Sequence, residues 1–244
     1  MSLKETSKYF EDLQETLKKR KPVKESFSSL AAMPLAKDQA LYVLDFRKKE
    51  LVFQKGIREF LGYSPEEFTL EKVTSYYHPE DYEIINRLLR ASIAYAAAHT
   101  TKTNDVALFV TGRIQHKNGE YIKTLRQSTV FEKDAEGRML SNVSIISDIS
   151  FIDMSDKVNW KFVATGLDEK KFRSYVTIEY KGFFSDREID VLRLLPGGQS
   201  SLEIANSLHI SKHTVDGHRR SMLRKSNCKN TVELINFAKT NGIL

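Results

Sequence analysis

Residues 200–225 read SSLEIANSLHISKHTVDGHRRSMLRK, and this stretch decides the fold of the C-terminal part of the chain. A turn is expected at His209-Ile210, and Ser211 then offers a hydroxyl group that can cap a new helix. Before the turn, apolar side chains recur at helical spacing at Leu202, Ile204, Ala205 and Leu208. The pattern therefore predicts two short helices joined by a tight turn.

The second of these helices combines an apolar face with a basic one. Val215, Met222 and Leu223 are expected to be buried. The side chains expected to point outward are Lys212, His213, Asp216, Arg219 and Arg220. Residues 212–229 contain six Lys and Arg residues and a single acidic residue, whereas the whole chain has a net charge of only +6. Two short helices of which the second is basic are typical of a helix-turn-helix that binds DNA.

Helix caps divide residues 182–244 into four helices. Capping boxes are formed by Ser185 with Glu188 and by Ser200 with Glu203, and the first helix is expected to end at Pro196-Gly197-Gly198. Ser211 caps the third helix, and Asn230 with Glu233 caps the fourth. The caps agree with the apolar pattern at every boundary, so a small all-α domain is predicted.

These residues resemble the LuxR-type helix-turn-helix, and the resemblance covers residues 182–244. It rests on residues 184–192, Glu203-Ile204-Ala205, Ser211, Thr214-Val215, His218, Lys225 and Val232-Glu233-Leu234. The resemblance implies that the third helix enters the major groove, where Asp216, Gly217 and Arg220 would face base edges. It also implies phosphate contacts, for which the candidates are Lys212, His213, Thr214, Arg219 and Lys225.

Arg220 is the best candidate for a specific base contact, because a guanidinium group can bond O6 and N7 of guanine together. Asp216 can accept a hydrogen bond from N4 of cytosine. Gly217 offers no side chain and costs about 1 kcal/mol of helix stability relative to alanine. Asp216 and Gly217 depart from the family pattern and leave more of the specificity to Arg220, while His218 and Val215 are expected to be structural.

Residues 38–150 predict an α+β domain in which an antiparallel sheet has helices on one face. Helix starts are expected at Ser64-Pro65-Glu66-Glu67 and at His78-Pro79-Glu80-Asp81, and the second opens a long helix that runs to Ala98. Asn118-Gly119 is a two-residue hairpin signal, with Lys117 expected to face Glu120 across the turn. Strands are expected at residues 41–46, 50–54, 106–116, 121–131 and 140–149.

This domain resembles a PAS domain. The resemblance rests on residues 62–67, on residues 78–81, on the terminal Ser147-Asp148-Ile149 and on the order of the elements. PAS domains are sensor and dimerisation modules, so the resemblance implies an input domain that is coupled to a DNA-binding output.

Two further segments complete the chain. Residues 1–22 predict an amphipathic helix with apolar groups at Leu3, Phe10, Leu13 and Leu17 and a stop at Pro22. Residues 151–181 are a connector with two interpretations. A β-hairpin that pairs residues 158–164 with residues 172–178 around Gly166 is favoured over a helix at residues 168–176, in which Phe172 and Val176 would lie four apart.

The composition excludes several classes of protein. Cys228 is the only cysteine, which excludes an intramolecular disulfide and suits a reducing compartment. No apolar run is long enough to span a bilayer, and residues 1–5 lack the apolar core of a signal peptide. We therefore expect a soluble cytoplasmic protein without a membrane partner.

No cofactor is identified from the sequence. A photosensor flavin needs a cysteine beside its ring, and Cys228 lies in the other domain. Haem needs an axial ligand, and the candidates His78, His99 and His116 all lie in motifs that suggest capping or exposed positions. Metal-ligand clusters, phosphate-binding glycine loops and catalytic triads are not evident, so no enzyme is expected. A small-molecule ligand of the PAS-like domain stays open, although the aromatic residues Tyr42, Phe53, Phe60, Phe109 and Tyr121 are expected to fill its core.

The leading hypothesis is a bacterial transcription regulator that binds a pseudo-palindrome in double-stranded DNA as a homodimer, with RNA polymerase as a further candidate partner. The alternative is a PAS protein-interaction module whose basic helix binds DNA only weakly and without specificity. A third interpretation, a sigma-factor-like fourth domain, is disfavoured because no promoter-melting domain lies upstream.

Overall fold

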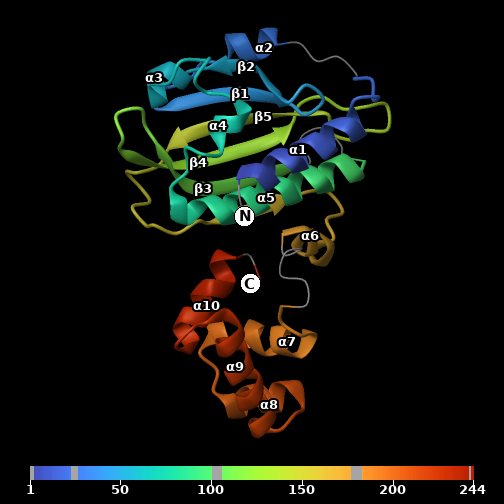
Figure 1. Cartoon of the computed structure of the whole chain (residues 1–244), viewed down its shortest axis with the longest axis vertical. Coiled ribbons are helices and arrows are strands. Elements are labelled where there is room, and N and C mark those ends of the chain that lie inside the picture. The colour runs from blue at the N-terminus through green and yellow to red at the C-terminus, as the bar shows by residue number, and fades with distance from the viewer. Residues whose placement is uncertain (1–2, 23–26, 101–105, 177–182, 242) are drawn as a thin grey trace. The chain divides into compact units, whose positions relative to one another are not determined.

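The computed structural model describes residues 3–22, 27–100, 106–176, 183–241 and 243–244 (Figure 1). The chain divides into an N-terminal unit, Met1–Phe172, and a C-terminal unit, Arg173–Leu244. Among the helices of the described residues, none is both long and apolar enough to cross a membrane.

The N-terminal unit is built on one antiparallel six-stranded sheet with the strand order β2-β1-β5-β4-β3-β6. The strands are β1 (Gln39–Asp45), β2 (Glu50–Lys55), β3 (Ala107–Gln115), β4 (Tyr121–Val130), β5 (Ser141–Asp148) and β6 (Trp160–Val163). The five strands predicted for residues 38–150 are confirmed, with β5 paired between β1 and β4. The sheet therefore joins segments about a hundred residues apart in the sequence, as in the register Leu41 opposite Ile145.

One face of this sheet carries the core. Along β3 the buried positions alternate with half-buried ones, and the buried set is Leu108, Val110, Gly112 and Ile114. The helices α3 (Ile57–Leu61), α4 (Leu70–Val73) and α5 (Pro79–Ala98) lie over one side of the sheet (Figure 1). The packing of α5 on β3 is direct, because a Cβ atom on Gly112 would lie 2.5 Å from Cδ1 of Ile85. The predicted fold class, an antiparallel sheet with helices on one face, is confirmed.

An ion pair fastens the first turn of α5 to the sheet. His78 caps the helix by accepting a hydrogen bond from the Glu80 N–H, as the sequence predicts for this start. Asp81 is buried and accepts hydrogen bonds from Nε, Nη2 and the backbone N–H of Arg113 on β3, at 3.1, 2.7 and 2.8 Å. Asp81 thus has several hydrogen bonds in place of the water that it gives up on burial.

Two local predictions in this unit are wrong. Ser64 begins a turn and not a helix. The N–H groups of Glu67 and Phe68 donate to the Ser64 carbonyl, and the Phe68 side chain is completely buried. In the β3–β4 hairpin the strands end at Gln115 and restart at Tyr121, so the connection is longer than two residues. Lys117 does not face Glu120 but pairs with Glu67 at 2.7 Å, and this long-range contact is not visible in the local pattern.

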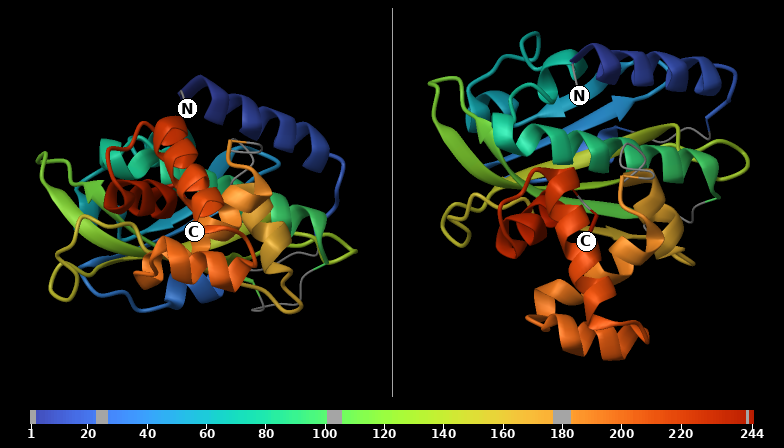
Figure 2. Two further views of the ribbon diagram at one scale, coloured as in Figure 1. Left: turned by 90° about the horizontal axis from the view of Figure 1, so that it is seen from below. Right: turned by 60° about the horizontal axis from the view of Figure 1, so that its bottom comes forward.

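The helix α1 (Leu3–Leu17) confirms the amphipathic helix predicted at the N-terminus. It runs beside α5 (Figure 2), and the Tyr9 hydroxyl donates to the Arg90 carbonyl at 3.1 Å. Arg20, just beyond the helix, donates to the carbonyl of Ala97 at 3.2 Å. Phe10 and Leu17 are buried, so the apolar stripe packs within the N-terminal unit. The short helix α2 (Ser28–Ala32) has no counterpart in the prediction.

The favoured hairpin in the connector is wrong in its pairing and its second strand, although its first strand, predicted at residues 158–164, contains β6. The strand β6 pairs with β3, whose edge is open, and residues Glu169–Val176 form the helix α6. The Phe172 ring stacks on Phe162 with 4.0 Å between centroids and meets the edge of Tyr95 on α5. A helix allows this contact because it turns Phe172 back toward the sheet, whereas the hairpin would have needed residues 172–178 as a strand.

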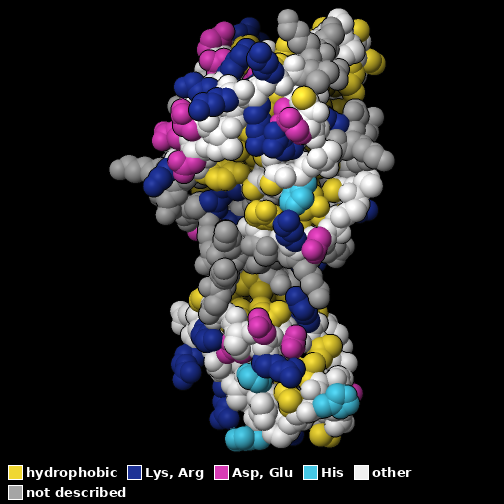
Figure 3. Space-filling model, turned by 90° about the vertical axis from the view of Figure 1, so that its right-hand side faces the viewer, with side chains coloured by type: hydrophobic (Ala, Val, Ile, Leu, Met, Phe, Trp, Pro, Cys, Tyr) yellow, Lys and Arg dark blue, Asp and Glu magenta, His cyan; other side chains and the backbone are white. Residues whose placement is uncertain are grey.

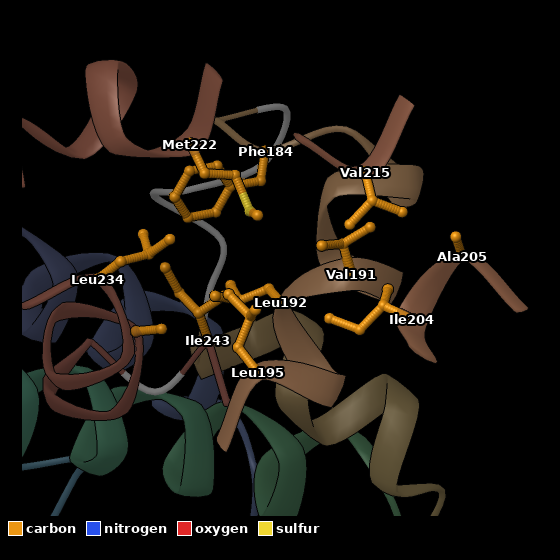
Figure 4. Close-up of a cluster of buried hydrophobic side chains, with 11 residues drawn as sticks. Phe184, Val191, Leu192, Leu195, Ile204, Ala205, Val215, Met222, Leu234 and Ile243 are labelled. Atoms are coloured by element: carbon orange, nitrogen blue, oxygen red, sulfur yellow. The ribbon is translucent and has the colours of Figure 1, made fainter. Parts of the chain in front are cut away.

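Beyond α6, the described residues of the C-terminal unit form four α-helices, as predicted. They are α7 (Asp186–Leu194), α8 (Ser201–Leu208), α9 (Lys212–Ser226) and α10 (Thr231–Thr240), and the 3-10 turn η2 (Leu195–Gly197) follows α7. Their apolar side chains converge on one core (Figure 4), which contains Phe184, Val191, Leu192, Leu195, Ile204, Ala205, Val215, Met222, Leu234, Ala238 and Ile243. Leu202, expected on the apolar face of α8, is 56% exposed instead.

Gly56 allows a direct test of the packing in the N-terminal unit. Its φ is +77°, and a Cβ atom there would lie 2.5 Å from the Gln39 carbonyl oxygen. We expect Gly56→Ala to lower the free energy of unfolding of this unit by about 2–4 kcal/mol, through left-handed strain and overpacking. Gly166→Ala is the matched control, since φ there is +68° and an added Cβ meets open space. Urea denaturation should show a clearly larger loss for Gly56→Ala, and equal losses would contradict this packing.

Candidate nucleic-acid interface

The turn between α8 and α9 is set by three local features. Ser200 and Glu203 form a complete capping box at the start of α8. His209 adopts the left-handed conformation with φ 52°, and the Ile210 N–H donates to the Ala205 carbonyl at 3.0 Å. The Ser211 hydroxyl then accepts a hydrogen bond from the Thr214 N–H and starts α9. The predicted helix-turn-helix is therefore formed, with its turn where the sequence places it.

One side of α9 is anchored in the core. Val215 and Met222 are completely buried and lie two turns apart on the same side of the helix. Figure 4 shows both side chains entering the cluster that also holds Val191 and Ile204. Because these residues fix the rotation of α9 about its axis, the opposite side of the helix is turned to solvent.

The solvent-facing side of α9 carries most of the predicted contact residues. Lys212, His213, Thr214 and Arg220 are exposed, and a Cβ atom on Gly217 would meet nothing within 4 Å. Arg224 is also exposed and lies one turn beyond Arg220 on this side. Arg224 was not among the contacts predicted from the sequence, although its spacing of four residues from Arg220 was a signal for it. Figure 3 shows dark-blue Lys and Arg side chains and cyan His side chains at the outer edge of the C-terminal unit.

Asp216 interacts with its own helix. Its Oδ2 accepts a hydrogen bond from Lys212 Nζ at 2.9 Å, in the (i, i+4) arrangement. Hydrogen bonds from Ser201 and Lys212 lower the pKa of Asp216, so this carboxylate is charged at neutral pH. The neighbouring Arg220 donates from Nε to the Asp216 carbonyl at 3.3 Å and has no ion pair with a described residue.

Arg219 is engaged inside the domain. Its guanidinium group donates to Ser201 Oγ at 3.1 Å and to Thr231 Oγ1 at 2.9 Å. These two hydroxyl groups stand at the first residues of α8 and α10, so one side chain links three helices. The structure therefore gives Arg219 a structural role beside the phosphate contact predicted from the sequence.

Lys225 is also held within the domain. Its Nζ lies 2.7 Å from Oε2 of Glu188, a buried residue of α7. The same carboxylate oxygen accepts a hydrogen bond from the Ser185 N–H at 2.7 Å in the capping box of α7. Burial by itself raises the pKa of Glu188, but hydrogen bonds from Lys225, Ser221 and Ser185 outweigh it and lower the pKa to about 2. This ion pair joins the last turn of α9 to the first turn of α7.

The histidines weighed as haem ligands make local contacts. His78 Nδ1 accepts from the Glu80 N–H, and His116 Nδ1 accepts from the Asn118 N–H. His99 bonds the Tyr95 carbonyl through Nδ1 at 2.8 Å, and its Nε2 lies 2.9 Å from Lys171 Nζ. Within the described ranges, no group of His, Cys, Asp and Glu side chains is arranged to hold a metal ion.

Comparison with known families agrees with both units. Residues 183–238 match the family described as bacterial regulatory proteins of the luxR family, and residues 50–146 match the PAS fold. The chain joins a PAS domain to a LuxR-type helix-turn-helix domain. The luxR match covers all four helices of the C-terminal unit, apart from the last residues of α10.

Two curated relatives are similar to this chain over about 60 residues. BvgA of Bordetella pertussis is 42% identical over 59 residues, which are 24% of this chain and 28% of that protein. The Fimbriae Z protein of Salmonella typhimurium is 40% identical over 60 residues, which are 25% of this chain and 29% of that protein. The chain thus spans less than a third of the length of these relatives. A crystal structure of Vibrio cholera VqmA with ligand and DNA matches at 14% identity and a TM-score of 0.33, covering 91% of this chain and 92% of its own.

The Glu188–Lys225 pair predicts a pH dependence of stability. Because the pKa of Glu188 falls from 4.5 to about 2 on folding, its contribution is complete above pH 4.5 and is lost as pH falls toward 2. That contribution is on the order of 3 kcal/mol for the C-terminal unit. Urea denaturation should show that Glu188→Gln is less stable than the wild type at pH 7, with a difference that shrinks below pH 4.5.

Asp190→Asn is the control for this experiment, because Asp190 lies on the same helix and its side chain is 38% exposed. We expect this variant to keep the pH dependence of the wild type. A constant gap between wild type and Glu188→Gln from pH 7 to pH 2 would refute the assignment to Glu188.

Proposed function

We propose that this chain is a sequence-specific DNA-binding transcription regulator, in which the PAS domain is the input and α9 reads the major groove. The observation that carries the proposal is the coincidence of the luxR-family match with the basic, solvent-facing side of α9. The proposal includes no catalytic activity, and such a regulator would act in the cytoplasm.

In this proposal Arg220 makes the main base contact, since its guanidinium group is exposed and suits guanine. Asp216 would accept from cytosine N4, and Gly217 would let the helix backbone approach the bases closely. Lys212, His213 and Thr214 at the start of α9 would contact phosphates, helped by the positive end of the helix dipole. We propose Arg224, which is also exposed, as a further phosphate contact. Arg219 and Lys225 would mainly hold α9 in place through the bonds already described.

We further propose that the chain binds DNA as a homodimer, with half-sites about 10 base pairs apart or a multiple of that. The candidate dimer surfaces are α1, the sheet of the PAS domain and α10. Val232 on α10 is 68% exposed, which suits a surface that a second copy covers. RNA polymerase is a proposed partner of the DNA-bound dimer.

A protein-interaction role is the second candidate, and one observation favours it. Phe151, Ile152 and Met154 lie in the loop after β5 and are 82%, 70% and 91% exposed. The buried side chain of Lys123 holds this loop in place, because its Nζ donates to the Ser155 carbonyl at 2.7 Å. A held loop with three large apolar side chains suits a protein partner. For this role the specificity ratio for DNA at physiological salt would lie near one, against about 10³ or more for a regulator.

Selection from a random DNA library with the full chain tests the main proposal. We expect an enriched motif with two-fold symmetry and half-sites about 10 base pairs apart. Enrichment without any motif, at an affinity equal to that for bulk DNA, would favour the interaction role. A single asymmetric half-site would count against the dimer but not against base reading.

The variant Arg220→Ala tests base reading on the selected site. We expect a loss of about 1–3 kcal/mol in binding free energy and a relaxed preference at one base pair. Arg193→Ala is the control, because Arg193 is exposed in the last turn of α7 and is not one of the proposed contacts. Fluorescence anisotropy on the selected site and on its single-base variants measures both effects. An equal loss on every DNA sequence would contradict a base contact.

Lys212 and Lys225 allow phosphate contact to be separated from support of the helix. Lys212→Ala should reduce the slope of log K against log salt by about one. Lys225→Ala should leave the slope nearly unchanged but lower the free energy of unfolding, because the buried carboxylate of Glu188 loses its ion pair. Salt titrations and denaturation of both variants measure the difference. A reduced slope with unchanged stability for Lys225→Ala would restore its role as a phosphate contact.

A further inference from the structure

The histidine at the end of α5 is held at both of its ring nitrogens. His99 Nδ1 lies 2.8 Å from the Tyr95 carbonyl oxygen, and its Nε2 lies 2.9 Å from Nζ of Lys171 on α6. A carbonyl oxygen only accepts hydrogen bonds, so Nδ1 carries the ring hydrogen, and a lysine ammonium group only donates, so Nε2 is the acceptor. The two contacts together fit one protonation state of His99, the neutral imidazole with its hydrogen on Nδ1.

This hydrogen bond lies next to the apolar contact that docks α6. The His99 ring stacks on Tyr95, with 4.3 Å between the ring centroids and an angle of 20° between the planes. The other neighbour of Tyr95 is Phe172 of α6, whose ring meets it edge-on at 6.0 Å. Phe172 and Tyr95 are buried, whereas the contact between Lys171 and His99 is exposed. Two adjacent residues therefore hold α6, one through a buried ring and one through a hydrogen bond that water reaches.

Protonation of His99 turns this contact from attractive to repulsive. Histidine titrates between about pH 5 and 8, and lysine is an ammonium group throughout this range. A protonated imidazole has a donor on each nitrogen, so its Nε2 no longer accepts from Lys171, and two positive groups face each other across 2.9 Å. Because the docked state favours the neutral ring, the contribution of this contact to docking is complete above the titration range of histidine and is lost as pH falls through it.

The carboxylates near this end of α5 are engaged elsewhere. Asp168, which precedes α6, accepts a hydrogen bond from the backbone N–H of Lys171 at 3.0 Å. The charged groups that other segments bring near the end of α5 pair with one another at distances between 2.8 and 3.5 Å, and these pairs are Arg20 with Asp134, Arg138 with Asp134 and Arg138 with Glu136. Within the described ranges, His99 has no bond to a carboxylate, so its protonation leaves a second positive charge beside Lys171 without compensation.

We propose that the docking of α6 on α5 is sensitive to pH, with His99 and Lys171 as a latch that holds α6 above neutral pH and loosens it in mild acid. The latch loses one hydrogen bond and gains one contact between like charges at the surface, and the two effects together lower the docking equilibrium about tenfold. Phe172 is the last residue of the N-terminal unit, so the latch lies where the chain passes into the C-terminal unit. The proposal stands whether or not the chain binds DNA.

Cleavage of the full chain by thermolysin measures the open fraction of α6. This protease cuts before large apolar residues, and Phe172 is 2% exposed, so the Lys171–Phe172 bond is cut only when α6 opens. The rate of cleavage follows the equilibrium population of the open form when opening and closing are fast. Each rate is divided by that of a free peptide of residues 166–178 at the same pH, which removes the pH dependence of the protease. We expect the normalised rate to rise about tenfold from pH 8 to pH 5.5, and an unchanged rate overturns the proposal.

Variants of the two partners identify the latch. His99→Gln is not protonated in this range and still offers an acceptor to Lys171, whereas Lys171→Met removes the second charge and leaves the His99 ring in place. We expect the normalised rate of each variant, measured against its own peptide, to stay within about twofold between the two pH values. His116→Gln is the control, because His116 belongs to the same unit and bonds the Asn118 N–H in the hairpin. This variant should keep the tenfold rise of the wild type.

The pH dependence of cleavage, and not its level, separates a latch from a general loss of packing. A tenfold rise that survives in either partner variant overturns the proposal, because another group then titrates, and so does loss of the rise in His116→Gln. The fluorescence of Trp160, the only tryptophan of the chain, shows whether a variant is docked at pH 8, since its ring lies 6.1 Å from that of Phe172. If His99→Gln is not docked at pH 8, Lys171→Met decides alone, and a rise equal to that of the wild type overturns the proposal.

Discussion

The C-terminal unit depends on how α9 is held, with one side packed in the core and the charged side in solvent. Val215 and Met222 fix the rotation of the helix in the apolar core. The Lys225–Glu188 pair then fixes its far end against α7. Because Glu188 also caps α7, one carboxylate serves two helices, and the exposed charges of α9 keep a defined direction.

The PAS domain places buried charge in two different ways. Asp81 and Arg113 satisfy each other between α5 and β3, and Asp45 and Arg47 do the same beside the first strand. Burial removes the water that solvates these charges, and the bidentate hydrogen bonds of each pair compensate for that loss. Arg126 has the same chemistry, but its Nε and Nη2 have no such partner among the described residues.

Much of the fold was predictable because its signals are local. Caps, turn residues and apolar spacing located the four helices α7 to α10, the long helix α5 and the six strands, β6 lying within the strand predicted at residues 158–164. Two of the wrong predictions have a common cause. Lys117 pairs with Glu67 and α6 packs on Tyr95, both through contacts between residues distant in sequence, whereas Ser64 forms a local turn. A local pattern contains no information on such partners, and so the contact of Lys117 with Glu120 and the hairpin around Gly166 were inferred in error.

The sequence by itself determined the two domains, the helix-turn-helix and the side of α9 that carries charge, because the periods of helix and strand and the caps are properties of neighbouring residues. Only the tertiary structure decided which of those charges are already engaged. Arg219 and Lys225 are equivalent to Arg220 in the sequence pattern, yet they bond Ser201, Thr231 and Glu188 on other helices. Arg126 is likewise an ordinary strand residue until the fold buries it. Burial and long-range pairing depend on the packing of the whole chain, and no short window of sequence contains them.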